Sequence, residues 1–225
     1  MKIIVISDSH GYLPEIDECD LFIHAGDICP ATNHQKRYQK YWLKDHFNPW
    51  LDVVPARHKV FIAGNHDIIF ETWKESLPEF HAHYLENSFV EIEGLKIWGS
   101  PWSPFFCNWA FNFPESDRND GIIAKACWDK IPDDIDLLVT HGPAYGYGDL
   151  TTYGGREHYG DKALKAALRR VKPQYHFFGH FHEGCDGEDT IMKMYHEDGT
   201  HTYCCNCSVV NERYIYTKQH TVITL

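Results

Sequence analysis

Residues able to bind metal ions follow a series of short apolar runs in this chain, and this pattern restricts the folds available to it. The runs are rich in β-branched and aromatic side chains and cover residues 2–7, 21–24, 59–63, 95–99, 136–140 and 175–179. Near-continuous apolar runs are typical of strands buried on both faces of a sheet. Helix-like segments at 35–45, 121–130 and 162–171 lie between some of them, and the chain becomes β-rich again from 202 to 225. The alternation predicts a mixed, layered α/β fold with sheet enclosed by helices.

The candidate metal ligands lie where five of these runs end. They are Asp8 and His10, Asp27, Asn65, His141, and His180 with His182, and two further polar residues, His66 and Asp67, follow Asn65 directly. Because loops at the carboxyl ends of strands converge on one crevice in α/β sheets, we expect these separated residues to meet there. Glycines before Asp27, Asn65 and His180 allow sharp turns that direct the next side chain into the crevice.

Two carboxylates, one Asn and four imidazoles suit two adjacent divalent cations, because carboxylate can bridge and imidazole favours transition metals. Such a pair, about 3.5–4 Å apart, supports in-line displacement at phosphorus by a shared, activated water. A single DxH or HxH motif carries little weight in a chain with 16 His. Five motifs in order, each after a β-like run, are far more specific.

These motifs resemble the signature of the calcineurin-like metallophosphoesterase superfamily, which runs DxH, GD, GNHD or GNHE, a later His, and GHxH. The matching segments are Asp8-Ser9-His10, Gly26-Asp27, Gly64-Asn65-His66-Asp67, Thr140-His141-Gly142 and Gly179-His180-Phe181-His182. The resemblance implies a four-layer α/β sandwich in which two mixed β-sheets are flanked by helices.

The resemblance also implies a role for each of these residues. Asp8, His10, Asp27 and His182 would hold one metal, whereas Asn65, His141 and His180 would hold the second, with Asp27 bridging. His66 would be a catalytic residue that binds no metal and protonates the leaving oxygen, a role that suits the near-neutral pKa of imidazole. Asn65 and Asp27 would complete the catalytic set. We expect manganese as the metal, although iron, zinc, nickel or cobalt suits the same ligands.

A closer branch is indicated by four segments: Ser100-Pro101-Trp102-Ser103-Pro104-Phe105-Phe106, Trp109-Ala110-Phe111-Asn112, His141-Gly142-Pro143 and Asn206-Cys207-Ser208. These segments are similar to metallophosphoesterase-domain-containing proteins that are grouped with class III cyclic-nucleotide phosphodiesterases. Some members of that branch lose the first His of GHxH, so the retained His180 predicts a complete dinuclear site. The run 26–32 lacks the Asp and Arg that follow the GD motif in Ser/Thr protein phosphatases. The partner that orients His66 is therefore open, with Asp67 as one candidate.

Three further residues are candidates for binding substrate. Asn33 and His34 follow Asp27 closely and could contact a phosphate, or could be solvated. Trp102 belongs to an aromatic segment, 99–114, which could stack on a nucleobase but which we expect to serve mainly the core.

Several other residues have simpler interpretations. We expect His24 to be a core histidine, or one that contacts a metal ligand without binding the metal itself, and we expect His81 and His83 to face solvent. Cys185 with Cys204-Cys205-Asn206-Cys207 lacks the spacing of a structural zinc site, so these cysteines are interpreted as buried free thiols.

The net charge of −11, from 21 Lys and Arg against 32 Asp and Glu, offers no basic footprint for long nucleic acid. No apolar run reaches the roughly 18–20 residues of a membrane span. The N-terminus has no basic region or cleavage site of a signal peptide, and the Cys usage fits a reducing compartment, so we expect a cytoplasmic protein. With no repeat or linker, residues 1–225 are interpreted as a single metallophosphoesterase domain.

The sequence therefore predicts a metal-dependent phosphohydrolase whose substrate is a small phosphate ester. The favoured activity is a phosphodiesterase on small nucleotide-like diesters, in which hydroxide held between the metals attacks phosphorus and His66 acts as general acid. A phosphomonoesterase or a nuclease using the same site is an alternative, although a nuclease would need a basic track that this chain lacks. A non-catalytic protein-binding module of the same fold is the alternative from another class.

Overall fold

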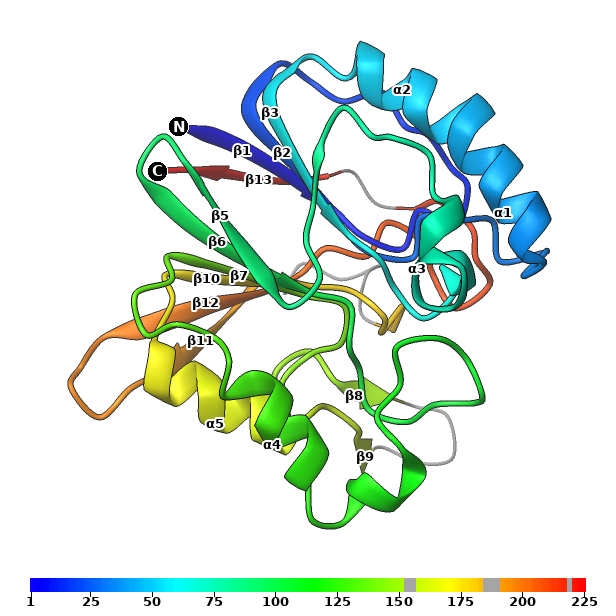
Figure 1. Ribbon diagram of the computed structural model, residues 1–225. Coiled ribbons are helices and arrows are strands. Elements are labelled where there is room, and N and C mark those ends of the chain that lie inside the picture. The colour runs from blue at the N-terminus through cyan, green and yellow to red at the C-terminus, as the bar shows by residue number, and fades with distance from the viewer. Residues whose placement is uncertain (152–156, 184–190, 218–219) are drawn as a thin grey trace.

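Two β-sheets pack face to face in the computed structural model, and helices cover the outer face of each sheet (Figure 1). The structure describes residues 1–151, 157–183, 191–217 and 220–225. The five-stranded sheet has the order β13-β1-β2-β3-β4, and the six-stranded sheet has the order β11-β12-β10-β7-β6-β5. Both sheets mix parallel and antiparallel pairs. The predicted four-layer α/β sandwich is therefore confirmed.

The first sheet is built mainly from the N-terminal part of the chain. Its strands are β1 (Lys2–Ile6), β2 (Cys19–Ala25), β3 (Ala56–Ile62), β4 (His83–Tyr84) and β13 (Thr221–Thr224). Strands β1 to β4 run parallel, and β13 pairs antiparallel with β1 at the edge. The helical segments that cover this sheet are α1 (Lys36–Trp42), a π-helical turn (Leu43–Phe47), α2 (Asn48–Val53), α3 (Ile68–Thr72) and a 3₁₀ turn (Lys74–Ser76).

The second sheet holds most of the later strands. They are β5 (Ser88–Ile92), β6 (Leu95–Ser100), β7 (Leu137–Thr140), β10 (Tyr175–Phe178), β11 (Ile191–Tyr195) and β12 (His201–Asn206). Its outer face is covered by α4 (Ile122–Trp128) and α5 (Lys162–Val171). The remaining elements are a 3₁₀ turn (Glu115–Arg118) and the small pair β8 (Leu150–Thr151) and β9 (Glu157–His158).

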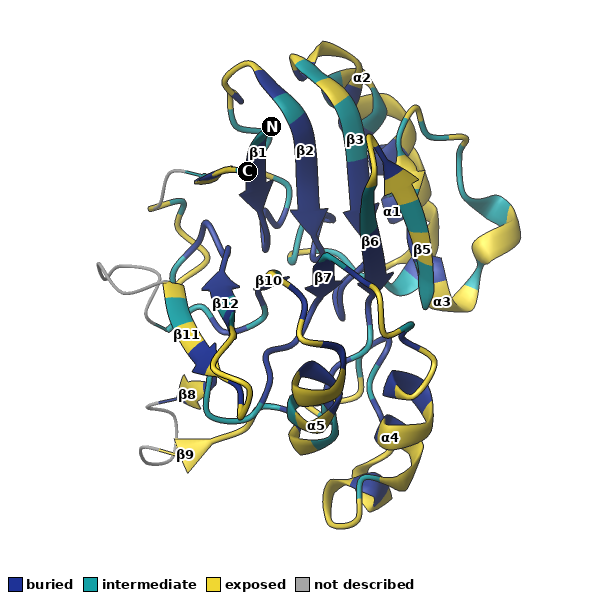
Figure 2. Ribbon diagram, turned by 90° about the vertical axis from the view of Figure 1, so that its left-hand side faces the viewer, coloured by how far each residue is buried: buried dark blue, intermediate teal, exposed yellow. Residues whose placement is uncertain are grey.

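The alternation of side chains along each strand explains why the layers hold together. In β1, Ile3 and Val5 face the second sheet and pack in a core with Leu137 and Phe177. Ile4, from the same strand, faces the other way and packs in a core under α1 and α2. A third core lies between the second sheet and helices α4 and α5. In Figure 2 the strands β1, β2, β7 and β12 are mostly buried, whereas β5, β8 and β9 carry exposed residues and α4 and α5 expose their outer faces.

Most predicted elements occur, and their ends differ by a few residues. Helix α5 spans the predicted 162–171, because its apolar stripe has helical spacing. The segment predicted as helix over 35–45 instead continues through the π-helical turn to Val53. Between β12 and β13 the described residues form isolated bridges in place of continuous strand. No helix in the described part of the chain is long and apolar enough to cross a membrane.

The N-terminus of α5 is fixed by a buried carboxylate. The Asp161 side chain accepts hydrogen bonds from the backbone N–H of Ala163 at 2.7 Å and of Leu164 at 3.1 Å. Its other oxygen accepts a hydrogen bond from Trp128 Nε1 at 2.6 Å, which joins α5 to the end of α4. Asp161 is therefore both a helix cap and a link between the two outer helices.

We expect Asp161→Ala to lower the free energy of unfolding by about 2–4 kcal/mol, because it removes a cap and leaves the buried Trp128 N–H without a partner. Urea unfolding followed by circular dichroism measures the change. Asp129→Ala is the matched control, since the Asp129 side chain is exposed and forms an i,i+4 ion pair with Lys125. That control should cost at most about 0.5 kcal/mol. Equal losses in the two variants would contradict the capping role.

Candidate metal centre

The carboxyl ends of strands from both sheets meet at one place in the fold. The backbone N–H of Asp8, after β1, donates to the carbonyl of Gly26, after β2, at 2.9 Å. The backbone N–H of Gly179, after β10, donates to the carbonyl of His141, after β7, at 3.0 Å. The side chains that follow these strands are consequently packed together.

The first group of candidate ligands consists of Asp8, His10 and His182, whose ligand atoms all lie within 4.8 Å of one another. His182 Nε2 lies 3.4 Å from Asp8 Oδ1 and 3.4 Å from His10 Nε2. His10 Nε2 in turn lies 3.6 Å from Asp27 Oδ2. These atoms surround a common point, as ligands of one cation would.

The second group is centred on the amide oxygen of Asn65. His180 Nδ1 lies 2.7 Å from Asn65 Oδ1, and His141 Nε2 lies 2.8 Å from the same oxygen. His141 Nε2 also lies 3.4 Å from Asp27 Oδ2. The carboxylate of Asp27 therefore faces both groups, which is the position that a bridging ligand would take.

The donor set fits divalent cations. Asp8 and Asp27 are buried carboxylates, and charges in such places need compensation. Burial lowers the pKa of His10 and of His180 to about 3, so both are neutral imidazoles with a lone pair available for a metal. Burial also acts to lower the pKa of His141, but Asp27 beside it raises the value to about 9. A proton on His141 thus gives part of the positive charge that a cation would supply.

The backbone at these positions is strained. Asp8, His10, Asp27 and His180 have φ values of 54°, 43°, 56° and 68°, in the left-handed region that non-glycine residues rarely adopt. Residues in such conformations cluster at functional sites, where the surrounding structure holds them.

The preceding glycines act partly as expected. Gly26 has a φ of 97°, as a sharp turn requires. At Gly179 the reason is close approach, because a Cβ atom there would lie 1.9 Å from Asp8 Oδ2. We expected a glycine at position 179 because of a sharp turn, but the structure requires it because a side chain there would collide with Asp8.

His66 is held from two sides by residues that come before it in the chain. His34 Nε2 lies 2.8 Å from His66 Nδ1, and this hydrogen bond leaves Nε2 of His66 on the side of Asp27, 4.0 Å from its Oδ2. Gln39, a buried residue of α1, donates from Nε2 to the His66 carbonyl at 2.7 Å and accepts from the Ile69 N–H at 3.0 Å. Sequence reasoning missed Gln39, and an uncharged buried Gln in a helix gives no signal to find it.

Asp67 does not contact the ring of His66, so its suggested orienting role has no support in the geometry. Its carboxylate accepts backbone hydrogen bonds from Ile28, Cys29 and Gly64 at 2.8 to 3.1 Å. Burial raises the pKa of Asp67 to about 6. The side chain instead ties the loop after β2 to the loop after β3.

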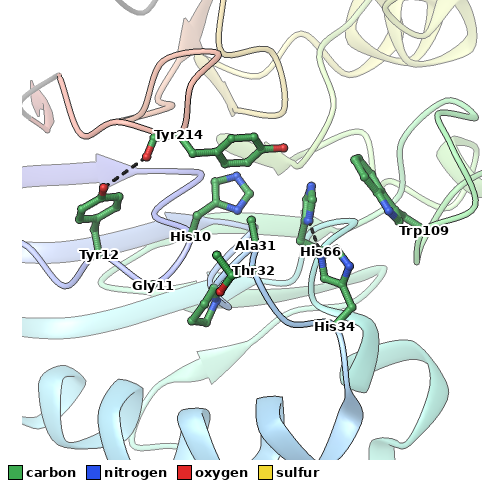
Figure 3. Close-up of a pocket in the computed structure, with 10 residues that line it drawn as sticks. His10, Gly11, Tyr12, Ala31, Thr32, His34, His66, Trp109 and Tyr214 are labelled. Carbon is green, nitrogen blue, oxygen red and sulfur yellow. Dashed lines mark hydrogen bonds between the residues drawn. The ribbon is translucent and has the colours of Figure 1, made fainter.

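A cavity of about 530 Å³ opens beside the ligand groups (Figure 3). Its described lining residues are His10, Gly11, Tyr12, Pro30, Ala31, Thr32, His34, His66, Trp109 and Tyr214. None of these lining residues is Lys or Arg. Sequence reasoning did not single out Tyr12 or Tyr214, and it noted Trp109 as part of the aromatic segment and of the resemblance but not as a substrate contact.

The other substrate candidates lie elsewhere. Asn33 accepts a hydrogen bond from the Gln35 N–H at 2.9 Å, as in a turn, and is not among the cavity-lining residues. Trp102 stacks on Phe113, with ring centroids 5.2 Å apart, and also packs against Phe111. Within the aromatic segment, Trp102 therefore belongs with the core side chains, and Trp109 is the residue that faces the cavity.

The remaining sequence expectations concern residues outside the ligand groups. His24 is buried and its Nε2 lies 2.9 Å from Ser9 Oγ, as expected for a core histidine. His81 and His83 are exposed, as expected. Cys204 is a buried free thiol, Cys205 and Cys207 are also buried, and Cys185 lies outside the described residues. The candidate metal groups found among the described residues contain no cysteine.

The profile of the calcineurin-like phosphoesterase family matches residues 1–184 of this chain. The chain belongs to this family. The human metallophosphoesterase domain-containing protein 1 is 32% identical over 251 residues, an alignment that covers all of this chain and 71% of the human protein. A UPF0046 protein of Caenorhabditis elegans is 30% identical over 220 residues, which covers 82% of this chain and 52% of that protein.

Solved structures share the phosphoesterase fold at low sequence identity. The protein TT1561 of Thermus thermophilus superposes with a TM-score of 0.53 at 11% identity, covering 93% of this chain and 89% of that one. A purple acid phosphatase from yellow lupin seeds superposes with a TM-score of 0.50 at 12% identity, covering 98% of this chain and 46% of that one. Membership of the family supports a phosphoesterase with a dinuclear divalent metal centre.

Metal content can distinguish the role of His180 as a metal ligand from that of His66 as a general acid. We expect His180→Ala to lose one of two bound metal ions, because it removes a ligand of the second group. We expect His66→Ala to keep both ions and to lose turnover by about 10²- to 10⁴-fold, the usual contribution of a general acid.

Metal content per chain is measured by mass spectrometry after loading with manganese. His81→Ala, an exposed histidine, is the matched control and should match the wild type in metal content and turnover. Equal metal loss in the His66 and His180 variants would contradict the separate roles.

Proposed function

We propose that this protein is a metal-dependent phosphodiesterase that hydrolyses small nucleotide-like diesters. The observation that carries the proposal is the cavity beside the ligand groups, which His66 and aromatic side chains line without any Lys or Arg among its described residues. A phosphodiester carries one negative charge at neutral pH, whereas a phosphomonoester approaches two. A site with no cationic side chain beyond its metals is better matched to the smaller charge.

Two groups of residues would hold the metals: Asp8, His10 and His182 for one, and Asn65, His141 and His180 for the other, with Asp27 shared. When bound, the divalent ions supply the Lewis acidity that polarises a phosphoryl oxygen and favours attack by water. Manganese is our first choice, and iron, zinc, nickel or cobalt would suit the same ligands. Backbone hydrogen bonds join the loops after the strands and hold these side chains in place, so we expect little reorganisation on binding.

His66 would act on the leaving group. In the hydrolysis of a diester, the oxygen of water forms a bond to phosphorus while the bond from phosphorus to the ester oxygen breaks. The departing alkoxide takes a proton from His66 Nε2, which lies 4.0 Å from Asp27 Oδ2 in a residue that lines the cavity. Solvent takes up the proton that the attacking water loses, and His66 is reprotonated from solvent for the next turnover.

His34 would position His66 for this transfer. When His66 is protonated, its Nδ1–H donates to Nε2 of His34, an arrangement consistent with the 2.8 Å separation. In this position His34 takes the place of a carboxylate partner. The ring of Trp109, whose centroid is 4.1 Å from that of His66, covers the pair on the cavity side.

The first test of the function compares bis-p-nitrophenyl phosphate with p-nitrophenyl phosphate, using metal-stripped protein with and without manganese. We expect manganese-dependent hydrolysis with kcat/KM at least about tenfold higher for the diester. Preference for the monoester would replace the proposal with a phosphatase. Absence of turnover with either ester, despite two bound metals, would favour a non-catalytic binding module.

The role of His34 predicts a graded series of variants. We expect His34→Ala to lower kcat about tenfold to a hundredfold with little change in KM, because His66 loses its orienting hydrogen bond. His34→Gln should recover part of the rate, since its amide oxygen can accept from Nδ1–H. Steady-state kinetics with the diester measures both, and His81→Ala again serves as control. A rise in KM without loss of kcat would show that His34 binds substrate and does not position His66.

A further inference from the structure

Tyr214 reaches the candidate centre from a part of the chain that carries none of the metal motifs. It lies beyond residues 1–184, the span that matches the family profile. Its φ is 57°, in the left-handed region that a bulky aromatic residue rarely adopts. An aromatic side chain held in this conformation beside a set of metal ligands suggests a functional reason for the strain.

The turn that carries Tyr214 is fixed by several hydrogen bonds. The Tyr214 N–H donates to the Asn211 carbonyl at 2.8 Å. The Asn211 side-chain oxygen accepts from the N–H groups of Arg213 at 3.0 Å and Ile215 at 3.1 Å. The Tyr12 hydroxyl donates to the Tyr214 carbonyl at 3.3 Å. The turn is thus tied to itself and to the loop after β1, which places the Tyr214 ring before any substrate arrives.

The ring packs on the first ligand group. Its centroid is 4.7 Å from that of His10 and 5.1 Å from that of His182, both in edge-on contact. The centroid of His66 is 6.1 Å away. The apolar body of the tyrosine therefore covers candidate ligands of the first metal, and the hydroxyl extends beyond them.

Figure 3 shows the Tyr214 hydroxyl pointing over the cavity, toward the side where His66 and Trp109 lie. None of the described residues forms a hydrogen bond with this hydroxyl. Because the described lining of the cavity has no Lys or Arg, a phosphoryl oxygen bound there needs another protein donor. A phenol O–H is a neutral donor that can serve a singly charged oxygen.

We infer that Tyr214 is a substrate-contacting residue whose hydroxyl donates a hydrogen bond to a nonbridging phosphoryl oxygen of the bound diester. The inference rests on the proposed function and adds to it a specificity-determining contact from outside the metal motifs. The phenol would supply a neutral hydrogen bond to the phosphoryl group, where Arg or Lys supplies a charged one in many phosphate sites. It also leaves the net charge of the site unchanged.

The test replaces only the hydroxyl, with Tyr214→Phe, and compares it with Tyr195→Phe, an exposed tyrosine of β11. We expect Tyr214→Phe to keep both metal ions and to lower kcat/KM for bis-p-nitrophenyl phosphate by about ten- to a hundredfold, the usual effect of losing one hydrogen bond to a charged group. Tyr195→Phe should match the wild type in both measurements.

A second measurement does not depend on turnover. Isothermal titration calorimetry of the manganese-loaded protein with diethyl phosphate, an inert diester, should show about tenfold weaker binding to Tyr214→Phe than to the wild type. Equal affinity and equal kcat/KM in the two proteins would overturn the contact, as would loss of metal from Tyr214→Phe or failure of the wild type to bind diethyl phosphate.

The two proposals fail separately. A wild-type protein that binds diethyl phosphate but hydrolyses no ester would overturn the phosphodiesterase. The weaker binding of diethyl phosphate by Tyr214→Phe would in that case still support the contact with Tyr214.

Discussion

The candidate metal centre depends on two buried carboxylates, Asp8 and Asp27, that lie close together. Oxygens of Asp8 and Asp27 lie within 4.8 Å of each other and of a His141 ring nitrogen, and both carboxylates are buried. Such an arrangement is unfavourable unless cations or hydrogen-bond donors compensate it. The histidines and the Asn around the two carboxylates provide ligands for cations, and the sheets bring all of them to one edge. The four-layer fold therefore holds these two carboxylates together and shields them from solvent.

The loops that carry these side chains include backbone conformations that are unfavourable by themselves. Four of the candidate ligands have left-handed φ values, and conformations of this kind cost of order 1–3 kcal/mol each. The surrounding loops hold them through backbone hydrogen bonds and through Asp67, which accepts from three N–H groups of two different loops. The apolar cores on both faces of each sheet supply the stability that offsets this strain. The apolar cores thus stabilise the fold, whereas the strained loops position the candidate ligands.

The sequence predicted the central strands and helix α5, and it predicted that the candidate ligands after these strands lie together, because local patterns encode both. Apolar runs indicate strands that are buried on both faces of a sheet, and the motifs indicate positions that need a side chain able to bind a metal. The partner of His66 was not predictable, because the contact between His34 and His66 spans 32 positions and depends on how the loop after β2 folds back. The position of Tyr214 beside the candidate ligands was not predictable either, because it depends on a turn stabilised by Asn211 and on packing against His10. Contacts of this kind arise from tertiary structure.

A histidine in place of a carboxylate beside His66 is physically consistent with the rest of the site. Asp8, Asp27 and Asp67 are three buried acidic side chains, and burial, with the charge on Asp27 adding to it, raises the pKa of Asp67. A fourth carboxylate at the position of His34 would add to this repulsion. A neutral imidazole accepts the same hydrogen bond from His66 Nδ1–H without adding charge. It also stabilises a protonated His66 less than a carboxylate would, so the proton on Nε2 is released more readily. The loop after β2 thus offers His66 a partner without negative charge, at the point where the site can least accept another carboxylate.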